Sequence, residues 1–529
     1  MASLPGSTWL ACERWLSAQG GEPEDFPEGA FVSCVPGQAA LLSGRMRSAW
    51  LGGFLVVISA SSSVSAESIE PEVRHIISSS GFRPFEVAVF ILGDAGQTLA
   101  AINAAQPFKP ASNQKVLTTA AALKLLGPGH TYRTSLGATV EIREGKVEGE
   151  LVLRGTGDPS ISSRYYKGGP ATLFRQWARE LREKGLLRVT GGVVADDTFF
   201  DDVRLAPSWD ERQQETWYSA QVSALTLNDN CVDVIVTPAA MGRLARVEIV
   251  PACPLIEVEG APQTVPGGKS RVVVHRKPGT NHVSVSGQIG ISSPTWRGNV
   301  TFHDPSLIFA NTLILALKEE GIQVEGQIRK AQRDADGRGS PLAPRVLVAL
   351  AEHSSTLLQD LGIILKRSQN LHAEILLKVL GAHRGGEGSV PGGDRAIREF
   401  LKTKKIPDTG VVVADGSGLS HQNRVTAAVL AKVLHSIRSE RYFSDYLKSL
   451  PIAGEDGTLG KRFRRSPVRG MLHAKTGYIR GVSCLSGYLV RDKKTASFSI
   501  LVNREKGGIG GAKALQEAIA EQVYNSLGK

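Results

Sequence analysis

The chain has 529 residues, of which 42% are hydrophobic and 21% are charged, and its net charge is +11 with a sequence pI near 9.4. This length exceeds one ordinary domain, and the globular composition excludes collagen-like and disordered chains. The net positive charge is compatible with an anionic partner such as a nucleic acid, a membrane surface or an acidic wall polymer. Net charge alone does not distinguish among these partners.

Residues 46–66 have the pattern of a secretory signal peptide. A positive start precedes a short apolar run, and a small-residue cleavage pattern places the cut after Ala66. The apolar run is shorter than a comfortable membrane span, so an uncleaved anchor is the less favoured alternative. A signal peptide normally begins at the initiator methionine, so we interpret residues 1–45 as an upstream misassigned start and Met46 as the true one. The mature protein is expected to be exported to the periplasm.

The mature chain opens with a predicted hairpin followed by a helix. Residues 85–92 form an apolar run typical of a strand, and residues 98–102 form the predicted return strand after a turn. From Ser112 onward, apolar and alanine residues recur at helical spacing until Gly127 ends the run.

Residues 138–345 contain mainly short segments of alternating apolar and polar residues, separated by turn residues. This pattern predicts a β-rich insertion of one or two small domains. One predicted helix, residues 172–184, interrupts the strands. Cys231 and Cys253 lie close enough in sequence to form a disulfide or to remain free thiols, and both alternatives stay open. The predicted strands cover residues 146–154, 191–195, 231–236, 246–250, 271–275 and 283–288.

The remainder is helical and then returns to strands. Strands at both ends with helices between them predict an α+β fold, in which one sheet built from both ends is covered by helices. The catalytic domain would then comprise residues 67–137 and 346–529. The predicted helices cover residues 355–380 (broken near 366–370), 394–402, 426–439 and 511–527, and the predicted strands cover residues 470–477, 483–490 and 496–502.

Three short motifs occur in order along the chain. They are residues 112–115 (Ser-Asn-Gln-Lys), residues 368–370 (Ser-Gln-Asn) and residues 475–477 (Lys-Thr-Gly). Each motif is weak alone, but their order, wide spacing and local setting match the signature of penicillin-binding serine enzymes.

The chemistry explains the first motif. A serine hydroxyl is a poor nucleophile until a base takes its proton, and three residues of helix place Lys115 on the same face as Ser112. Lys115 can act as that base if burial and a neighbouring cation such as Lys475 lower its pKa.

The other two motifs supply proton transfer and substrate binding. Ser368 can pass the proton to the leaving amine, and Asn370 can orient Lys115 or accept a substrate amide. The third motif can bind a substrate carboxylate by charge and hydrogen bonding. The expected binding residues there are Lys475, Thr476, Gly477 and Tyr478, with the backbone N–H groups of Ser112 and Tyr478 as the expected oxyanion hole.

The chain strongly resembles the D-alanyl-D-alanine carboxypeptidase/endopeptidase family, the class C low-molecular-mass penicillin-binding proteins. The resemblance spans about residues 85–505 and extends beyond the three motifs. The further matching segments are residues 110–115 (Pro-Ala-Ser-Asn-Gln-Lys), 157–159 (Gly-Asp-Pro), 218–225, 228–230 (Asn-Asp-Asn), 370–374, 415–420 (Asp-Gly-Ser-Gly-Leu-Ser) and 453–458.

This resemblance implies a transpeptidase/β-lactamase-like domain that carries a large insertion between the first and second motifs. It implies a serine acyl-enzyme mechanism on peptidoglycan stem peptides, covalent inhibition by β-lactam antibiotics, and no metal or organic cofactor. The export signal argues against nucleic acid as a partner, and the basic balance allows a loose association with a membrane surface.

The chain departs from the family at several positions. His421 stands where an arginine is common, and Arg480 lies three residues past the third motif, where smaller or neutral residues are common. Gln369 replaces a frequent aspartate. His421 and Arg480 are candidate substrate-binding residues, and Asp210 is a weaker candidate, with a surface loop acid as its ordinary interpretation.

Two other interpretations remain open. A class A β-lactamase shares the first and third motifs, but the long insertion argues against it. A catalytically silent wall-binding or penicillin-sensing protein would carry the same residues without turnover. The sequence leaves open the balance between removing a terminal D-alanine and cutting cross-links.

Overall fold

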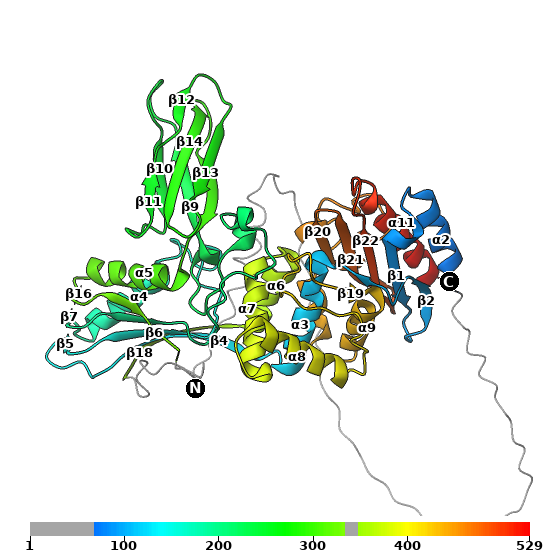
Figure 1. Ribbon diagram of the computed structural model, residues 1–529, viewed down its shortest axis with the longest axis horizontal. Helices are drawn as coiled ribbons and strands as arrows, with labels where there is room; N and C mark the ends of the chain where they lie inside the picture. The colour runs from blue at the N-terminus through cyan, green and yellow to red at the C-terminus, as the bar shows by residue number, and fades with distance from the viewer. Residues whose placement is uncertain (1–67, 334–347, 529) are drawn as a thin grey trace, which may run out of the picture. The chain divides into compact units, whose positions relative to one another are not determined.

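A computed structural model describes residues 68–333 and 348–528 (Figure 1). The predicted upstream segment 1–45, with two of the five cysteines, and the predicted signal peptide 46–66 lie outside the described residues. Within the described ranges, no helix has both the length and the apolar character needed to cross a membrane.

A five-stranded antiparallel sheet joins the two ends of the described chain, as the sequence predicts. Its order is β2-β1-β22-β21-β20, so the early strand β1 pairs directly with the late strand β22. The strands are β1 (Val87–Leu92), β2 (Thr98–Ile102), β20 (Leu472–Ile479), β21 (Val482–Arg491) and β22 (Lys494–Asn503).

Helices cover both faces of this sheet (Figure 1). Strand β1 is buried along its whole length because alternate side chains enter two different cores. Val87, Val89 and Ile91 pack with α2 (Glu70–Ser79) and α11 (Ala512–Leu527), whereas Ala88 and Phe90 pack on the side of α9 (Ala427–Ile437). The sheet is therefore the middle layer between helices.

The larger helical core forms around α3 (Gln114–Leu125), whose residues from Gln114 to Leu123 are all buried. A 3₁₀ turn, Ala111–Asn113, leads into this helix and carries Ser112. The predicted helix 355–380 is broken as expected, into α6 and α7 on either side of Ser368. The surrounding elements are α6 (Leu357–Lys366), α7 (Asn370–Leu380), a π-helical turn (Gly381–Gly385), α8 (Val390–Thr403), α10 (Phe443–Ser449), and the small strands β3 (Pro107–Phe108) and β19 (Val425–Thr426).

The insertion is built on a second five-stranded sheet, of order β17-β8-β6-β4-β18. Strand β4 pairs with β18 along its length, so this sheet extends beyond both ends of the predicted 138–345 range. Its strands are β4 (Thr131–Ala138), β6 (Leu151–Gly155), β8 (Val193–Asp196), β17 (Ile328–Lys330) and β18 (Val348–Thr356), and a smaller sheet beside it contains β5 (Lys146–Val147), β7 (Arg188–Val189) and β16 (Gln323–Val324).

The prediction of a single helix in the insertion is wrong, because α5 (Pro305–Glu319) joins the predicted α4 (Thr172–Glu183). Pro305 stands in the first turn of α5, where its missing N–H costs no hydrogen bond and its fixed φ suits the helix. The apolar run after it resembles a buried strand by composition, and only its length favours a helix.

An outer lobe of the insertion, residues 231–301, consists of strands only. The predicted strands at 231–236, 246–250, 271–275 and 283–288 are confirmed as β9, β10, β13 and β14. The lobe contains β9 (Cys231–Thr237), β10 (Arg246–Val250), β11 (Glu257–Glu259), β12 (Gln263–Val265), β13 (Arg271–Arg276), β14 (His282–Gly290) and β15 (Trp296–Thr301). Cys231 and Cys253 are both buried free thiols, so the disulfide alternative is not realised in the structure.

The architecture as a whole confirms the predicted α+β class, an antiparallel sheet covered by helices with a large β-rich insertion. Both segments that flank the insertion, α3 with its preceding turn and α6 with α7, belong to the same buried core. This arrangement brings the first and second motifs together although 258 positions separate Ser112 from Asn370.

Candidate active site

Ser112 lies half-buried on the 3₁₀ turn that precedes α3. The residue before it, Ala111, has φ of 45°, a left-handed conformation that costs an L-residue about 1 kcal/mol or more. Two glycines enclose this turn. A Cβ on Gly418 would collide with the Ala111 carbonyl, and a Cβ on Gly477 would lie 2.8 Å from the Pro110 carbonyl oxygen. The glycine of the third motif is therefore required by packing against the serine turn, in addition to its expected role in binding substrate.

Lys115 is fully buried and its Nζ lies 3.1 Å from Ser112 Oγ. The same nitrogen donates to Asn370 Oδ1 at 2.7 Å and to the Ser417 carbonyl at 2.8 Å. An amide oxygen and a carbonyl oxygen only accept hydrogen bonds. A neutral Lys115 amine can satisfy both with its two N–H groups and direct its lone pair at the Ser112 hydroxyl, which is the arrangement a general base needs.

Burial lowers the pKa of Lys115 to about 7, although the negative charges of Glu374 and Asp415 raise it. Glu374 accepts hydrogen bonds from the backbone N–H groups of Gly416 and Ser417 at 2.9 and 2.8 Å. Burial, and then the charge of Asp415, raise the pKa of Glu374 to about 8. The lysine is thus poised near neutral pH beside acids that are themselves buried.

A second serine–lysine pair joins the second and third motifs. Lys475 is fully buried, and its Nζ donates to Ser368 Oγ at 2.8 Å and to the Thr476 carbonyl at 2.7 Å. Burial, and then the charge of Lys115, hold the pKa of Lys475 well below its usual range. Ser368 has φ of 59°, so it turns sharply between α6 and α7. The structure therefore groups Ser112 and Asn370 around Lys115, and pairs Ser368 with Lys475.

The rest of the third motif lies along strand β20. Thr476 Oγ1 donates to Thr458 Oγ1 at 2.7 Å, and Tyr478 is 66% exposed. Thr458 is a neighbour that motif reasoning did not single out, although it ends one of the segments that carry the family resemblance.

His421 and Arg480 lie near each other in a basic cluster. Burial lowers the pKa of His421, and the positive charges of Lys109, Arg424 and Arg480 lower it further. Lys109 immediately precedes the serine turn. Lys109, Arg424 and Arg480 carry the positive charge of this cluster, and the predicted substrate contacts of His421 and Arg480 stay predictions.

Asp210 is already paired. Its carboxylate caps a 3₁₀ turn, Glu211–Gln213, and accepts from the backbone N–H and the guanidinium of Arg212 at 2.7 to 3.1 Å. The side chain of its neighbour Trp209 reaches the site instead, donating from Nε1 to Asp415 Oδ2 at 2.9 Å. The candidate role of Asp210 in substrate binding stays a prediction.

Asp415 holds the loop that accepts Lys115. It is fully buried and accepts hydrogen bonds from Gly418 N–H, Ser420 N–H and Asn423 Nδ2 at 2.6 to 2.7 Å, besides that of Trp209. Neither Asp415 nor Glu374 was among the predicted site residues. Both belong to segments that carry the family resemblance. Glu374 lies within an apolar run and Asp415 beside glycines, and an acid in such a setting is a sequence signal that could have indicated a buried carboxylate.

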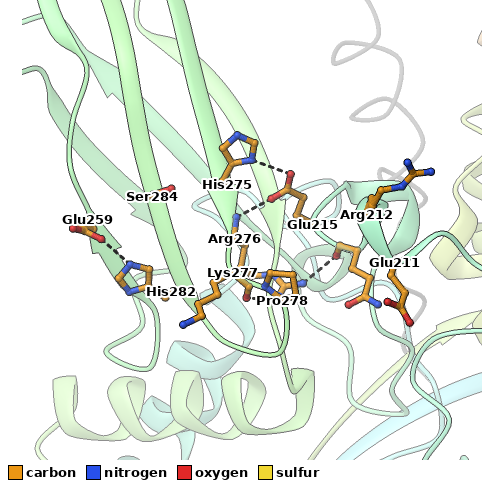
Figure 2. Close-up of a pocket in the computed structure, with 11 residues that line it drawn as sticks. Glu211, Arg212, Glu215, Glu259, His275, Arg276, Lys277, Pro278, His282 and Ser284 are labelled. Carbon is orange, nitrogen blue, oxygen red and sulfur yellow. Dashed lines mark hydrogen bonds and ion pairs between the residues drawn. The ribbon is translucent and has the colours of Figure 1, made fainter.

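A cavity of about 500 Å³ lies elsewhere, between the outer lobe and the turn after Asp210 (Figure 2). Figure 2 shows Glu215 facing His275 and Arg276, and Glu259 facing His282. No motif residue lines this cavity. In residues 68–333 and 348–528, no group of three histidine, cysteine or acidic side chains is arranged to hold a metal ion, and the predicted independence from cofactors stays a prediction.

Comparison with known proteins adds independent findings. A profile of the D-Ala-D-Ala carboxypeptidase 3 (S13) family matches residues 86–523. The D-alanyl-D-alanine carboxypeptidase of Actinomadura sp. (strain R39) is 33% identical over 447 residues, which cover 82% of this chain and 80% of that protein. The D-alanyl-D-alanine carboxypeptidase DacB of Haemophilus influenzae is 26% identical over 451 residues, which cover 82% of this chain and 89% of that protein.

The fold also matches a solved structure. The crystal structure of penicillin binding protein 4 (dacB) from Haemophilus influenzae aligns with a TM-score of 0.71 at 22% identity, over 86% of this chain and 99% of that one. At this identity the match concerns the fold, and it agrees with the transpeptidase/β-lactamase-like architecture expected from the sequence.

Proposed function

The chain belongs to the D-Ala-D-Ala carboxypeptidase 3 (S13) family, and from this membership we propose how its site works. It is a serine-type D-Ala-D-Ala carboxypeptidase, a hydrolase of peptidoglycan stem peptides. In our proposal, Ser112 is the nucleophile and forms the acyl-enzyme. The observation that carries this assignment is the contact of the buried Lys115 Nζ with Ser112 Oγ at 3.1 Å, with its two other bonds directed at acceptors.

Acylation begins when neutral Lys115 takes the proton of the Ser112 hydroxyl. Oγ attacks the carbonyl carbon of the penultimate D-alanine, and the carbonyl oxygen becomes an oxyanion. The backbone N–H groups of Ser112 and Tyr478 are placed in this proposal as its two donors. The left-handed Ala111 supports that role because the enclosed turn fixes the direction of the N–H that follows it.

Collapse of the tetrahedral intermediate breaks the C–N bond and leaves the acyl group on Ser112 as an ester. The leaving nitrogen needs a proton, and Lys115 holds the one that it took in the first step. The Ser368 hydroxyl, which lies 2.8 Å from Lys475 Nζ, can relay this proton to the leaving nitrogen. Water then attacks the ester with Lys115 again as base. The free enzyme and the shortened peptide result.

The substrate carboxylate is proposed to lie against the third motif. Thr476 offers a hydroxyl, Lys475 a buried nitrogen, and Arg480, which lowers the pKa of His421, offers positive charge. A terminal D-alanine carries such a carboxylate. Cutting cross-links breaks the same type of amide bond, so D,D-endopeptidase activity accompanies the carboxypeptidase activity in this proposal or takes its place.

A β-lactam antibiotic would acylate the same serine, because its strained amide occupies the position of the scissile bond. One relative, from Dictyostelium discoideum, bears the name penicillin-sensitive carboxypeptidase A and is 24% identical over 430 residues. Slow hydrolysis of the resulting ester distinguishes this behaviour from that of a β-lactamase.

Export to the periplasm and loose association with a membrane surface belong to the proposal as well. The net charge of +11 and the segment 46–66 support them. Sedimentation of the mature protein with anionic vesicles tests the association, and retention in the supernatant at low salt would contradict it.

Covalent labelling of the mature protein by a reporter penicillin tests the proposed function, with Ser112→Ala as the paired variant. We expect stable labelling of the wild type, loss of at least 10³-fold in labelling rate for Ser112→Ala, and D-alanine release from a pentapeptide by the wild type alone. Unchanged labelling of Ser112→Ala would reject Ser112 as nucleophile. Labelling without D-alanine release would favour a penicillin sensor, and rapid penicillin turnover would favour a β-lactamase.

A further inference from the structure

One buried carboxylate of the insertion, Asp229, reaches the second motif. It lies on a turn in which Asn228, Asp229 and Asn230 have φ of 50°, 56° and 53°. Three successive left-handed residues persist only where surrounding contacts determine them. Here Asn230 Nδ2 donates to the Gln221 carbonyl at 2.7 Å, and Asn228 Nδ2 donates to the Cys231 carbonyl at 3.1 Å. The turn is thus fixed from both ends.

The Asp229 side chain is 4% exposed and has three partners. Its Oδ2 accepts from Gln369 Nε2 at 2.6 Å, its Oδ1 faces His372 Nε2 at 3.2 Å, and it forms an ion pair with Arg164. A buried carboxylate is costly unless its lone pairs are satisfied, and these partners satisfy it.

Two of these partners stand on either side of Asn370. Gln369 immediately precedes α7, and His372 lies in its first turn. Asn370 accepts from Lys115 through Oδ1, and its Nδ2 donates to the Tyr218 carbonyl of the insertion at 2.9 Å. The insertion therefore contacts Asn370 directly and through both neighbours.

His372 extends the connection into the helical core. It is fully buried, so it is not a surface histidine, and its second ring nitrogen lies 2.5 Å from Asp360 Oδ1. Asp360 in turn accepts from the Tyr132 hydroxyl at 3.2 Å. The histidine bridges two buried carboxylates, one from the insertion and one from α6.

We propose that Asp229 is a positioning residue, which acts through Gln369 and His372 to hold the start of α7. Its carboxylate fixes the sharp turn at Ser368 and the direction of Asn370 Oδ1, and so the orientation of Lys115 toward Ser112. The insertion then forms part of the support of the active site. This inference rests on the proposed function, because it names a residue that holds Asn370 and Lys115 in the orientation which that function needs.

The first test compares Asp229→Asn with Asp233→Asn in the mature protein. Asp233 accepts a hydrogen bond from Asn228 of the same turn, so it is a matched acid. Displacement of a catalytic group by about 1 Å costs about 10²-fold in rate. We expect Asp229→Asn to lower the rate of penicillin acylation and kcat for D-alanine release by about 10- to 100-fold, with KM within about two-fold of wild type. Asp233→Asn should stay within about two-fold of wild type in both rates.

A charge exchange keeps the test decisive if Asp229→Asn unfolds. Gln369→Glu places a second carboxylate against Asp229, and the repulsion between the two should slow acylation relative to the wild type. The double variant Asp229→Asn with Gln369→Glu restores an amide–carboxylate pair in the reverse sense and should recover acylation at least ten-fold over Gln369→Glu alone. Circular dichroism and Tm establish the folded fraction to which each rate is referred.

Wild-type rates in folded Asp229→Asn would overturn the inference. So would a lowered Tm with unchanged kcat, which is what a purely structural role predicts, and so would a double variant no faster than Gln369→Glu. These outcomes leave labelling of the wild type intact. A wild type that neither labels nor releases D-alanine would instead overturn the proposed function, and the inference with it.

Discussion

The interior of the active site and the solvent-facing side of the outer lobe place their charged groups in different environments. In the site, Lys115 and Lys475 are fully buried and Glu374 nearly so, and burial is the largest influence on the pKa of each. In the outer lobe, His282 lies at the surface and pairs with the exposed acids Glu257 and Glu259.

The difference shows where reactive groups are found in this molecule. The 500 Å³ cavity of Figure 2 lies against the outer lobe, and no motif residue lines it. The predicted catalytic side chains lie where burial makes the ionised form of a side chain unfavourable. There, each hydrogen bond of the buried lysines is made to a defined acceptor. Two buried lysines in contact with serines therefore distinguish the active site from this cavity.

The largest expected effect concerns the pH dependence of Lys115. Its lone pair is available only when the amine is neutral, so the acylation rate should rise as pH increases through about 7 and level off above it. The measurement is the rate of labelling by a reporter penicillin across the pH range.

Lys115→Ala supplies the control for that profile. Loss of the base should slow acylation by about 10²- to 10⁴-fold and remove the rise near neutral pH. A profile that kept its rise in this variant would show that another group titrates.

A smaller effect is expected at Gly477, where the site meets strand β20. A methyl group would lie 2.8 Å from the Pro110 carbonyl oxygen and 3.1 Å from Asn113 Oδ1, so strand and serine turn must separate. We expect Gly477→Ala to slow acylation about ten-fold or more and to lower the free energy of unfolding by about 1–3 kcal/mol. Chemical denaturation and labelling kinetics measure the two, and a variant with wild-type kinetics would show that the turn can yield.

The smallest effect is expected in the outer lobe. Hydrogen bonds to Glu259 and Glu257 raise the pKa of His282 above its usual value, so their stabilising effect is present below that usual value and disappears as pH rises through the folded-state pKa. His282→Ala should shift Tm by no more than about 1 °C at about pH 6, by nothing measurable at about pH 9, and leave acylation unchanged. A change in acylation rate would mean that this lobe is coupled to the site after all.

The sequence predicts much of this molecule because its strongest signals are local. Apolar residues recur with the spacing of a strand or a helix within each of several segments, and the structure contains all of these elements. They are the strand at 85–92, the alanine-rich helix after Ser112 and the three strands near the C-terminus. The three motifs likewise anticipate the contacts of Lys115 with Ser112 and of Lys475 with Ser368.

The remainder depends on contacts between segments distant in the chain. Asp229 and Gln369 are 140 positions apart, and nothing in the spacing of either segment indicates their pairing. The packing role of Gly477 against Pro110 is equally invisible in a strand motif. Helix α5 was missed for a different reason, since an apolar run preceded by proline suits a buried strand as well as a helix.

The pairing of β1 with β22 has a consequence for how the molecule is made. Val89 lies opposite Ile500 in the middle of the sheet, so one of the first strands to leave the ribosome has its neighbour among the last. Until β22 arrives, β1 presents an unpaired apolar edge, and the strand β20 that carries Lys475 has no sheet connecting it to β1. A chain that lacks β22 can therefore form its insertion but not the sheet that carries Lys475, so an incomplete molecule has no assembled catalytic centre.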